Sequence, residues 1–132
     1  MSIMQDRFKF RLYDKAISET VYDVCVGFIK DNCKTNDWVC ADTSYGQITY
    51  RGDKLKDIVL MQCTGLKDKN GMLIYEGDIV KDNYETLHYV RWVYDSWQLF
   101  PCTQNNYTID IVDNEIEVIG NIYENPELLE VK

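Results

Sequence analysis

The stretch from Leu60 to Val80, LMQCTGLKDKNGMLIYEGDIV, constrains the fold more than any other part of this sequence. It places an Asn-Gly turn between two apolar runs, with a Thr-Gly corner before it and a Glu-Gly-Asp corner after it. Because glycine accepts positive φ and Asn-Gly favours tight turns, the pattern predicts strands joined by closely defined corners. The residues expected to form these corners are Thr64, Gly65, Asp68, Asn70, Gly71, Glu76, Gly77 and Asp78.

The region before this stretch predicts further strands. Phe8, Phe10 and Leu12 alternate with Lys9 and Arg11 over Arg7 to Tyr13, which predicts a strand with one buried face. Val21 to Ile29 is rich in β-branched and aromatic residues, which favour strands. We therefore expect two strands within the first thirty residues.

Glycine and polar residues mark the interruptions in the same region. Gly27 is a candidate bulge within the second strand. Asp31 to Asp37, DNCKTND, predicts a loop, because Asn and Asp side chains bond their own backbone. Trp38 to Ala41 and Gln47 to Arg51 are predicted strands, and the polar residues from Gly52 to Lys56 mark a candidate boundary between two modules.

The second half of the chain is also strand-rich. Asp57 to Cys63 is a continuous apolar run, which predicts a strand buried on both faces. Leu87 to Tyr94 and Trp97 to Pro101 predict a hairpin joined at Asp95-Ser96. The remaining predicted elements are strands at Tyr107 to Val112 and Ile116 to Ile119, and a short C-terminal helix that opens at Asn125-Pro126-Glu127. The spacing of strands and turns predicts a mainly β protein with a small barrel in its second half.

Composition and charge exclude several classes of protein. Hydrophobic residues make up 45% and charged residues 27% of the 132 residues, which indicates a folded globular chain. The net charge of -8 and the scattered Lys and Arg disfavour binding to double-stranded nucleic acid. No apolar run approaches the roughly 20 residues that span a bilayer, and the N-terminus lacks a signal-peptide pattern. We expect a cytoplasmic protein with no membrane partner.

The five cysteines, an odd number without a C-x-x-C pair, indicate neither a disulfide framework nor a zinc knuckle. They are Cys25, Cys33, Cys40, Cys63 and Cys102. Buried, reduced thiols are the expectation for such cysteines.

Three segments of the sequence resemble the YopX-like proteins, a family encoded mainly by bacteriophages and prophages of Gram-positive bacteria. They are FKFRLYD at Phe8 to Asp14, MQCTGLKDKNGMLIYEGDIVK at Met61 to Lys81 and EVIGNIYENPELL at Glu117 to Leu129. The resemblance implies a mixed fold whose C-terminal part is similar to an SH3-like barrel, a protein of unknown function, and a bacterial host cell. It brings no catalytic residue to this chain, and Cys63 stands where the family usually has an aromatic residue.

Pattern and resemblance together predict a mainly β (α+β) protein. An N-terminal mixed β module at residues 1–56 is expected to precede a small SH3-like β-barrel module at residues 57–132, which ends in a short helix. The two modules are compatible with one compact unit.

Motifs for metal and nucleotide chemistry fail on spacing. If Gly71 took the sharp-turn position of an EF-hand, the first ligand would fall on Leu66 and the last on Gly77, neither of which has a carboxylate. A hairpin turn is the better interpretation of Asp68 to Gly71. Neither a P-loop nor a dinucleotide-binding glycine pattern is present. We expect no cofactor and no metal.

The candidate catalytic groups also have structural interpretations. His88 is the single histidine and could pair with Cys63 or Cys102, although no signature of a cysteine enzyme surrounds either residue. Four acids near predicted strand ends could form an acid-base or magnesium site, but surface acids are expected in so acidic a chain. These acids are Asp53, Asp57, Asp78 and Asp82.

The aromatic hairpin is the candidate interaction surface. Tyr89, Arg91, Trp92 and Trp97 could stack single-stranded bases or contact a protein. Strand alternation places Tyr89 and Arg91 on one face and Trp92 on the other, so core packing is expected to take up part of the set.

Two functional classes remain, and we expect no enzyme. The first is an accessory protein without catalytic activity that acts by protein contact and self-associates through strand edges or aromatic patches. Its protein partner is not indicated by the sequence. The alternative is a nucleic-acid-associated module that uses Arg91 and Trp92. An enzyme that uses the clustered acids is the least favoured class.

Overall fold

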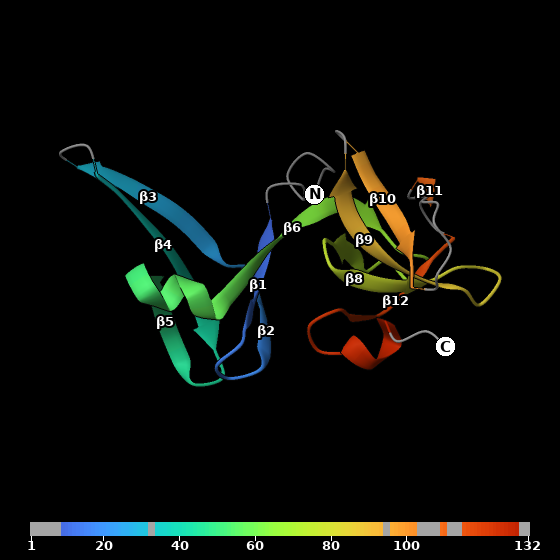
Figure 1. Ribbon diagram of the computed structural model, residues 1–132, viewed down its shortest axis with the longest axis horizontal. Coiled ribbons are helices and arrows are strands. Elements are labelled where there is room, and N and C mark those ends of the chain that lie inside the picture. The colour runs from blue at the N-terminus through green and yellow to red at the C-terminus, as the bar shows by residue number, and fades with distance from the viewer. Residues whose placement is uncertain (1–8, 32–33, 94–95, 103–108, 111–114, 130–132) are drawn as a thin grey trace. The chain divides into compact units, whose positions relative to one another are not determined.

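The computed structural model describes residues 9–31, 34–93, 96–102, 109–110 and 115–129, and most of these lie in strands (Figure 1). The mainly β prediction is confirmed. Contacts divide the chain into two compact units, which we call the N-terminal unit (Lys9–Met61) and the C-terminal unit (from Gln62 onward). The expected division into residues 1–56 and 57–132 stays a prediction.

The N-terminal unit contains a hairpin and a three-stranded sheet. Strands β1 and β2 pair in antiparallel fashion, and the second sheet has the order β3-β4-β5. A 3-10 helix, η1, follows β5. The elements are β1 (Phe10–Asp14), β2 (Glu19–Tyr22), β3 (Cys25–Asp31), β4 (Lys34–Thr43), β5 (Gly46–Arg51) and η1 (Gly52–Asp57).

The C-terminal unit is centred on a five-stranded sheet of order β11-β10-β9-β8-β12. Strand β6 contributes residues to both units and pairs with β7, giving the order β2-β1-β6-β7. The predicted C-terminal helix is present as the 3-10 helix η2. The elements are β6 (Ile58–Lys67), β7 (Leu73–Tyr75), β8 (Asp78–Lys81), β9 (Leu87–Val93), β10 (Ser96–Pro101), β11 (Ile109–Asp110), β12 (Glu117–Asn121) and η2 (Pro126–Leu129).

Each unit has its own apolar core, as its alternating strands require. The buried cluster of the N-terminal unit consists of Leu12, Val21, Val24, Val39, Ala41 and Tyr50. The buried cluster of the C-terminal unit consists of Ile74, Val80, Val90, Leu99 and Ile116.

The prediction of one strand over Val21 to Ile29 is wrong. The chain forms two strands there, because Asp23 adopts positive φ (56°) and breaks the extended backbone between β2 and β3. The β-branched residues gave no sign of this corner. The predicted bulge at Gly27 is also wrong, since β3 and β4 pair without a break in register.

The predicted loop over Asp31 to Asp37 is wrong for most of its length. Asp31 ends β3, and Lys34 to Asp37 form the first residues of β4, paired with β3. Cross-strand pairing overrides the turn preference of Asn and Asp here. The predicted strands at Trp38 to Ala41 and Gln47 to Arg51 are confirmed within β4 and β5.

Two burial predictions need correction. Arg11 is buried, with its Nη1 donating to the Tyr22 hydroxyl at 3.3 Å, so the basic residue of the alternating pattern does not face water. The strand predicted from Asp57 to Cys63 is not buried on both faces, because Met61 and Cys63 are buried but Leu60 is exposed and Gln62 is only partly buried.

The turn predictions of the second half are largely confirmed. The chain turns at Asn70-Gly71, but only Gly71 has positive φ (82°). Strands β9 and β10 form the predicted hairpin, with Ser96 already paired to Val93. The strand predicted at Tyr107 to Val112 is seen as β11, and its other residues lie outside the described ranges, as does Tyr94-Asp95.

Candidate interaction surface

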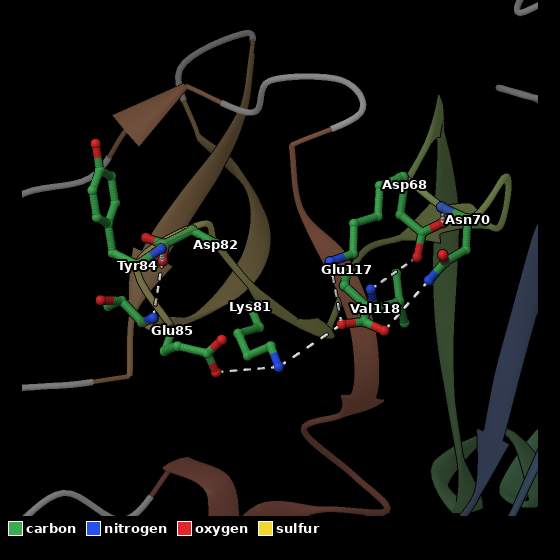
Figure 2. Close-up of polar contacts among 10 residues, drawn as sticks. Asp68, Asn70, Lys81, Asp82, Tyr84, Glu85, Glu117 and Val118 are labelled. Atoms are coloured by element: carbon green, nitrogen blue, oxygen red, sulfur yellow. Dashed lines mark hydrogen bonds and ion pairs between the residues drawn. The ribbon is translucent and has the colours of Figure 1, made fainter.

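The loop between β6 and β7 is organised by the buried carboxylate of Asp68 (Figure 2). Its Oδ1 accepts hydrogen bonds from the N–H groups of Asn70 and Met72, and its Oδ2 accepts one from Val118, each at 2.9 Å. Gly71 N–H donates to the Asp68 carbonyl at 3.0 Å. Asp68 therefore fixes this loop against β12, and its hydrogen bonds with Asn70 and Gly71 close the loop.

A network of ion pairs surrounds Glu117 beside this loop (Figure 2). Its carboxylate lies 3.7 Å from Lys69 Nζ and 3.9 Å from Lys81 Nζ, and it accepts a hydrogen bond from Asn70 Nδ2 at 3.4 Å. Lys81 also pairs with Glu85 at 3.3 Å. Because these groups are in contact with water, each pair adds at most about 1 kcal/mol. The network links the β6-β7 loop and the β8-β9 loop to β12, and each of its charged side chains has an oppositely charged partner.

The corner between β7 and β8 is built the same way. Gly77 has φ 86° and its N–H donates to the Val90 carbonyl at 2.9 Å. The buried Asp78 carboxylate accepts from Tyr75 N–H at 2.7 Å, and Glu76 N–H donates to a β6 carbonyl. Gly77, Asp78 and Glu76 therefore specify the corner, as the sequence predicted.

Thr64 and Gly65 act where the register between β6 and β7 shifts. Thr64 Oγ1 donates to the Ile74 carbonyl at 2.8 Å and accepts from Leu66 N–H at 3.1 Å. Gly65 has φ 84°, and its N–H donates to the Cys63 sulfur at 3.4 Å. Together they hold β6 against β7 across the irregularity.

His88 is buried on β9 and paired with Asp82. The His88 Nε2 to Asp82 Oδ2 distance is 3.0 Å, and Asp82 Oδ1 accepts from the N–H groups of Tyr84 (2.8 Å) and Thr86 (2.9 Å). Burial raises the pKa of Asp82, but the hydrogen bonds from His88, Thr86 and Tyr84 together outweigh it, so the pKa lies below its ordinary value. The carboxylate orders the turn between β8 and β9.

The cysteines considered as nucleophiles are buried. Burial raises the pKa of the Cys102 thiol, which disfavours the reactive thiolate. Cys63 is fully buried, and His88 Nε2 bonds to Asp82. The expectation of buried thiols is wrong for Cys25, which is exposed, and for Cys40, which is only partly buried, while Cys33 lies outside the described residues.

Of the four acids considered for catalysis, Asp53 and Asp57 belong to the N-terminal unit, and Asp78 and Asp82 belong to the C-terminal unit. Asp53 lies on η1 in an exposed pair with Lys56 at 3.5 Å. Asp57 ends η1, and its carbonyl accepts from Lys15 N–H at 2.7 Å. Across the described ranges, no group of three or more His, Cys, Asp or Glu side chains is placed to hold a metal ion.

The aromatic hairpin divides the predicted interaction residues between two faces. Trp92 and Trp97 are paired across β9 and β10, with ring centroids 5.0 Å apart and planes at 71°. Trp97 packs against the core, while 45% of Trp92 is exposed. The other face carries the paired rings of Tyr89 and Phe100, 5.5 Å apart.

Arg91 belongs to the second of these faces. Its guanidinium carbon lies 5.1 Å from the centroid of the Phe100 ring, a cation–π contact. Because Arg91 and Trp92 are neighbours on one strand, their side chains point to opposite faces. The predicted platform of Arg91 with Trp92 is therefore not assembled as one surface.

An apolar groove in the N-terminal unit was missed by the sequence reasoning. This β3 groove has a volume of about 290 Å³ and is lined by Val26, Gly27, Trp38, Val39, Leu55, Ile58 and Leu60. Val26 is paired with Val39, and Val39 with Tyr50, so Val26 shares the face of two core residues. Even so, 47% of Val26 is exposed. The apolar alternation of Val24 and Val26 was the available signal, but the loop predicted over Asp31 to Asp37 concealed the first residues of β4 and their pairing with β3.

Within the described residues, no helix is both long and apolar enough to cross a membrane.

The fold is similar to those of proteins with solved structures. The structure is similar to that of protein EF1440 from Enterococcus faecalis, with TM-score 0.60 and 28% identity, over 92% of this chain and 97% of that one. It is also similar to YopX from Bacillus subtilis, with TM-score 0.60 and 21% identity, over 94% and 99% of the two chains.

Sequence similarity identifies the family of this chain. No curated protein shows significant similarity to the chain. The family model described as YopX protein matches residues 9–130, which is nearly the whole sequence. The chain belongs to the YopX protein family.

Proposed function

We propose that this protein acts without catalysis, by protein contact, and that a second copy of the chain occupies the β3 groove. The observation that carries the proposal is the position of Val26. It lies on the core face of the β3-β4-β5 sheet, yet nearly half of its side chain is exposed at 47%. The core face of the sheet therefore extends beyond the residues that cover it, and Leu60 is exposed beside it in the same groove.

The edge of the same sheet supports an extended occupant. Strand β3 pairs with β4 on one side, and no strand of the described residues pairs with its other side (Figure 1). Such an edge presents a row of backbone N–H and C=O groups that another strand can complete. In a dimer with twofold symmetry, β3 of the second copy pairs in antiparallel fashion with this edge. The same contact covers the β3 grooves of both copies.

Charge distribution favours a second copy over an acidic or basic partner. The N-terminal unit carries eight Lys and Arg against eight Asp and Glu, whereas the C-terminal unit carries five against thirteen. Two N-terminal units therefore approach without net repulsion, and the groove is lined by apolar residues. Interface cores are poor in charge in the same way.

The groups considered for catalysis support a non-catalytic role. His88 and Asp82 bond to each other, and Asp78 accepts a backbone hydrogen bond that fixes a corner. Burial raises the pKa of the Cys102 thiol, which disfavours the thiolate. His88, Asp82 and Asp78 each make hydrogen bonds that stabilise the fold.

The proposal is tested by the molar mass in solution, measured by light scattering over a wide range of protein concentration. We expect the mass to rise above the 15.6 kDa of one chain. Val26→Lys should weaken association about tenfold or more, because a lysine on an edge strand opposes strand addition. A mass of one chain at every concentration would contradict self-association.

The matched control is Met72→Lys in the C-terminal unit. Met72 is 53% exposed and Val26 is 47% exposed, so the two changes add the same charge at similar exposure. Met72→Lys should associate as the unchanged protein does. Leu60→Lys and Ile119→Lys form a second matched pair, at 36% and 38% exposure. If the control variants lost association as much as Val26→Lys and Leu60→Lys do, the loss would come from the added charge in general, which would contradict a specific contact at the β3 groove.

A second candidate function is contact with single-stranded nucleic acid. The observation that favours it is the grouping of Tyr89, Phe100 and Arg91 on one face of the hairpin. Aromatic rings and arginine stack on bases without regard to sequence. Titration with a single-stranded oligonucleotide at low salt tests it, and Arg91→Ala should abolish any binding. An unchanged tryptophan signal and no bound oligonucleotide would remove this candidate.

Family membership supports finer proposals on fold and origin. We propose that the C-terminal unit is an SH3-like barrel, since its five-stranded sheet is joined by tight corners. The resemblance to YopX-like proteins supports an origin in a bacteriophage or prophage and action in the cytoplasm of a bacterial host. We expect no cofactor, no membrane and no double-stranded nucleic acid among its partners.

A further inference from the structure

Two cysteines on consecutive strands, fifteen positions apart in the sequence, lie directly opposite each other in the sheet of the N-terminal unit. Cys25 on β3 is paired with Cys40 on β4, in an antiparallel register that runs without a break along both strands. Both are free thiols in this structure. Opposite residues of an antiparallel pair have Cα atoms about 4.5–5.5 Å apart. This separation lies within the roughly 4.4–6.8 Å range of disulfides.

The two thiols lie on the water-facing side of the sheet. Cys25 is exposed and Cys40 is partly exposed, and Cys40 is paired in turn with the exposed Thr49 on β5. The alternate residues Val39 and Tyr50 face the core. Cys25 and Cys40 therefore differ from the buried thiols of the C-terminal unit, because a small oxidant in solution can reach them.

We propose that Cys25 and Cys40 are a redox-active pair that forms a cross-strand disulfide by exchange with a low-molecular-weight disulfide. The thiolate of Cys25 attacks one sulfur of the small disulfide, forms a mixed disulfide and releases one small thiolate. The thiolate of Cys40 then attacks the Cys25 sulfur and releases the second small thiolate. The two cysteine thiols lose two electrons and two protons, and the small disulfide is reduced to two thiols.

Trp38 gives a local optical readout of this step. It lies two residues from Cys40 on the same face of β4 and is paired with Gly27 of β3. A Cβ added at Gly27 would overlap the Trp38 ring, so the indole covers the strand next to Cys25. A disulfide formed beside the indole should quench its emission, and a chain with Trp92→Phe and Trp97→Phe isolates the Trp38 signal.

The experiment treats the full chain with oxidised glutathione and maps the product by trypsin digestion and mass spectrometry without reduction. Lys30 and Lys34 separate Cys25, Cys33 and Cys40 into three peptides, so the connectivity is read directly. We expect peptides 16–30 and 35–51 to be joined, with the loss of two hydrogens. The joined species should disappear in Cys25→Ser and in Cys40→Ser and persist in Cys63→Ser.

The controls separate this pair from general thiol oxidation. Dithiothreitol should restore both the free peptides and the Trp38 emission. Glutathione adducts on Cys25 without the joined peptides, or a bond from either cysteine to Cys33, would overturn the proposal. If a serine variant is less stable, the peptide map of the unsubstituted chain still shows whether Cys25 and Cys40 are joined. The result is independent of self-association, since an intramolecular bond leaves the mass of the chain unchanged apart from the two hydrogens.

Discussion

At Asp68 one buried carboxylate accepts three backbone hydrogen bonds, two within its own loop and one from Val118 on β12. Asp82 holds the next hairpin turn in the same manner, through Tyr84 and Thr86. A carboxylate satisfies several N–H groups at once because each of its oxygens can accept more than one hydrogen bond. The acidic residues of the turns are therefore part of the fold, and their density is a poor guide to catalysis.

Replacing Asp68 with Asn should destabilise the protein strongly. The amide nitrogen of Asn cannot accept a hydrogen bond, so it leaves at least one buried N–H group unsatisfied. Hydrogen bonds to charged groups contribute about 1.5–3 kcal/mol each. We expect a loss of about 2–4 kcal/mol in the free energy of unfolding, measured with urea. Asp53→Asn, at a side chain 99% exposed, is the control and should leave the urea midpoint unchanged.

Acid should remove the stabilisation that Asp82 provides. The pKa of Asp82 is lower in the folded protein than its ordinary value of 3.8, so the folded state binds this proton more weakly than the unfolded state. The stability from Asp82 is therefore complete above about pH 5 and is lost as the pH falls through 3.8 and below. Thermal unfolding between pH 6 and pH 2 should show a smaller loss in Asp82→Asn than in the unchanged protein. Identical pH profiles would contradict this account.

The strands and corners differ in how well the sequence predicts them. The corners at Gly71 and Gly77 could be predicted, because positive φ at glycine is a local preference. The break at Asp23 and the early start of β4 at Lys34 could not, because pairing with a neighbouring strand decides both. For the same reason the sequence could not predict the pairing of Cys25 with Cys40, and the alternation of Val24 and Val26 indicated an apolar face but not the β3 groove.

Gly27 illustrates a close contact between strands. A Cβ at this position would overlap the Trp38 ring, so Gly27→Ala should displace the indole and cost about 1–3 kcal/mol. Trp38→Leu frees the space, and the double variant should lose less stability than the sum of the two single changes. Additive losses in the double-mutant cycle would show that the ring does not limit residue 27. Gly46→Ala, which meets no atom within 4 Å, tests positive φ alone.

The whole molecule divides into a neutral unit and an acidic one. The net charge of -8 is carried by the C-terminal unit, with five basic and thirteen acidic residues. Like charges on two copies repel each other, and salt screens this repulsion over a Debye length of about 10 Å at 0.1 M and about 3 Å at 1 M. An apolar contact between N-terminal units should therefore be no weaker at high salt.

Sedimentation equilibrium of the full chain at about 0.1 M and about 1 M NaCl tests the central claim most directly. We predict that the mass rises from the 15.6 kDa of one chain towards twice that value as the concentration increases, and that association is at least as tight at the higher salt. Val26→Lys should remain close to the mass of one chain under conditions where Met72→Lys associates. The mass of a single chain for the unchanged protein, at every protein concentration and at both salt concentrations, would contradict the account.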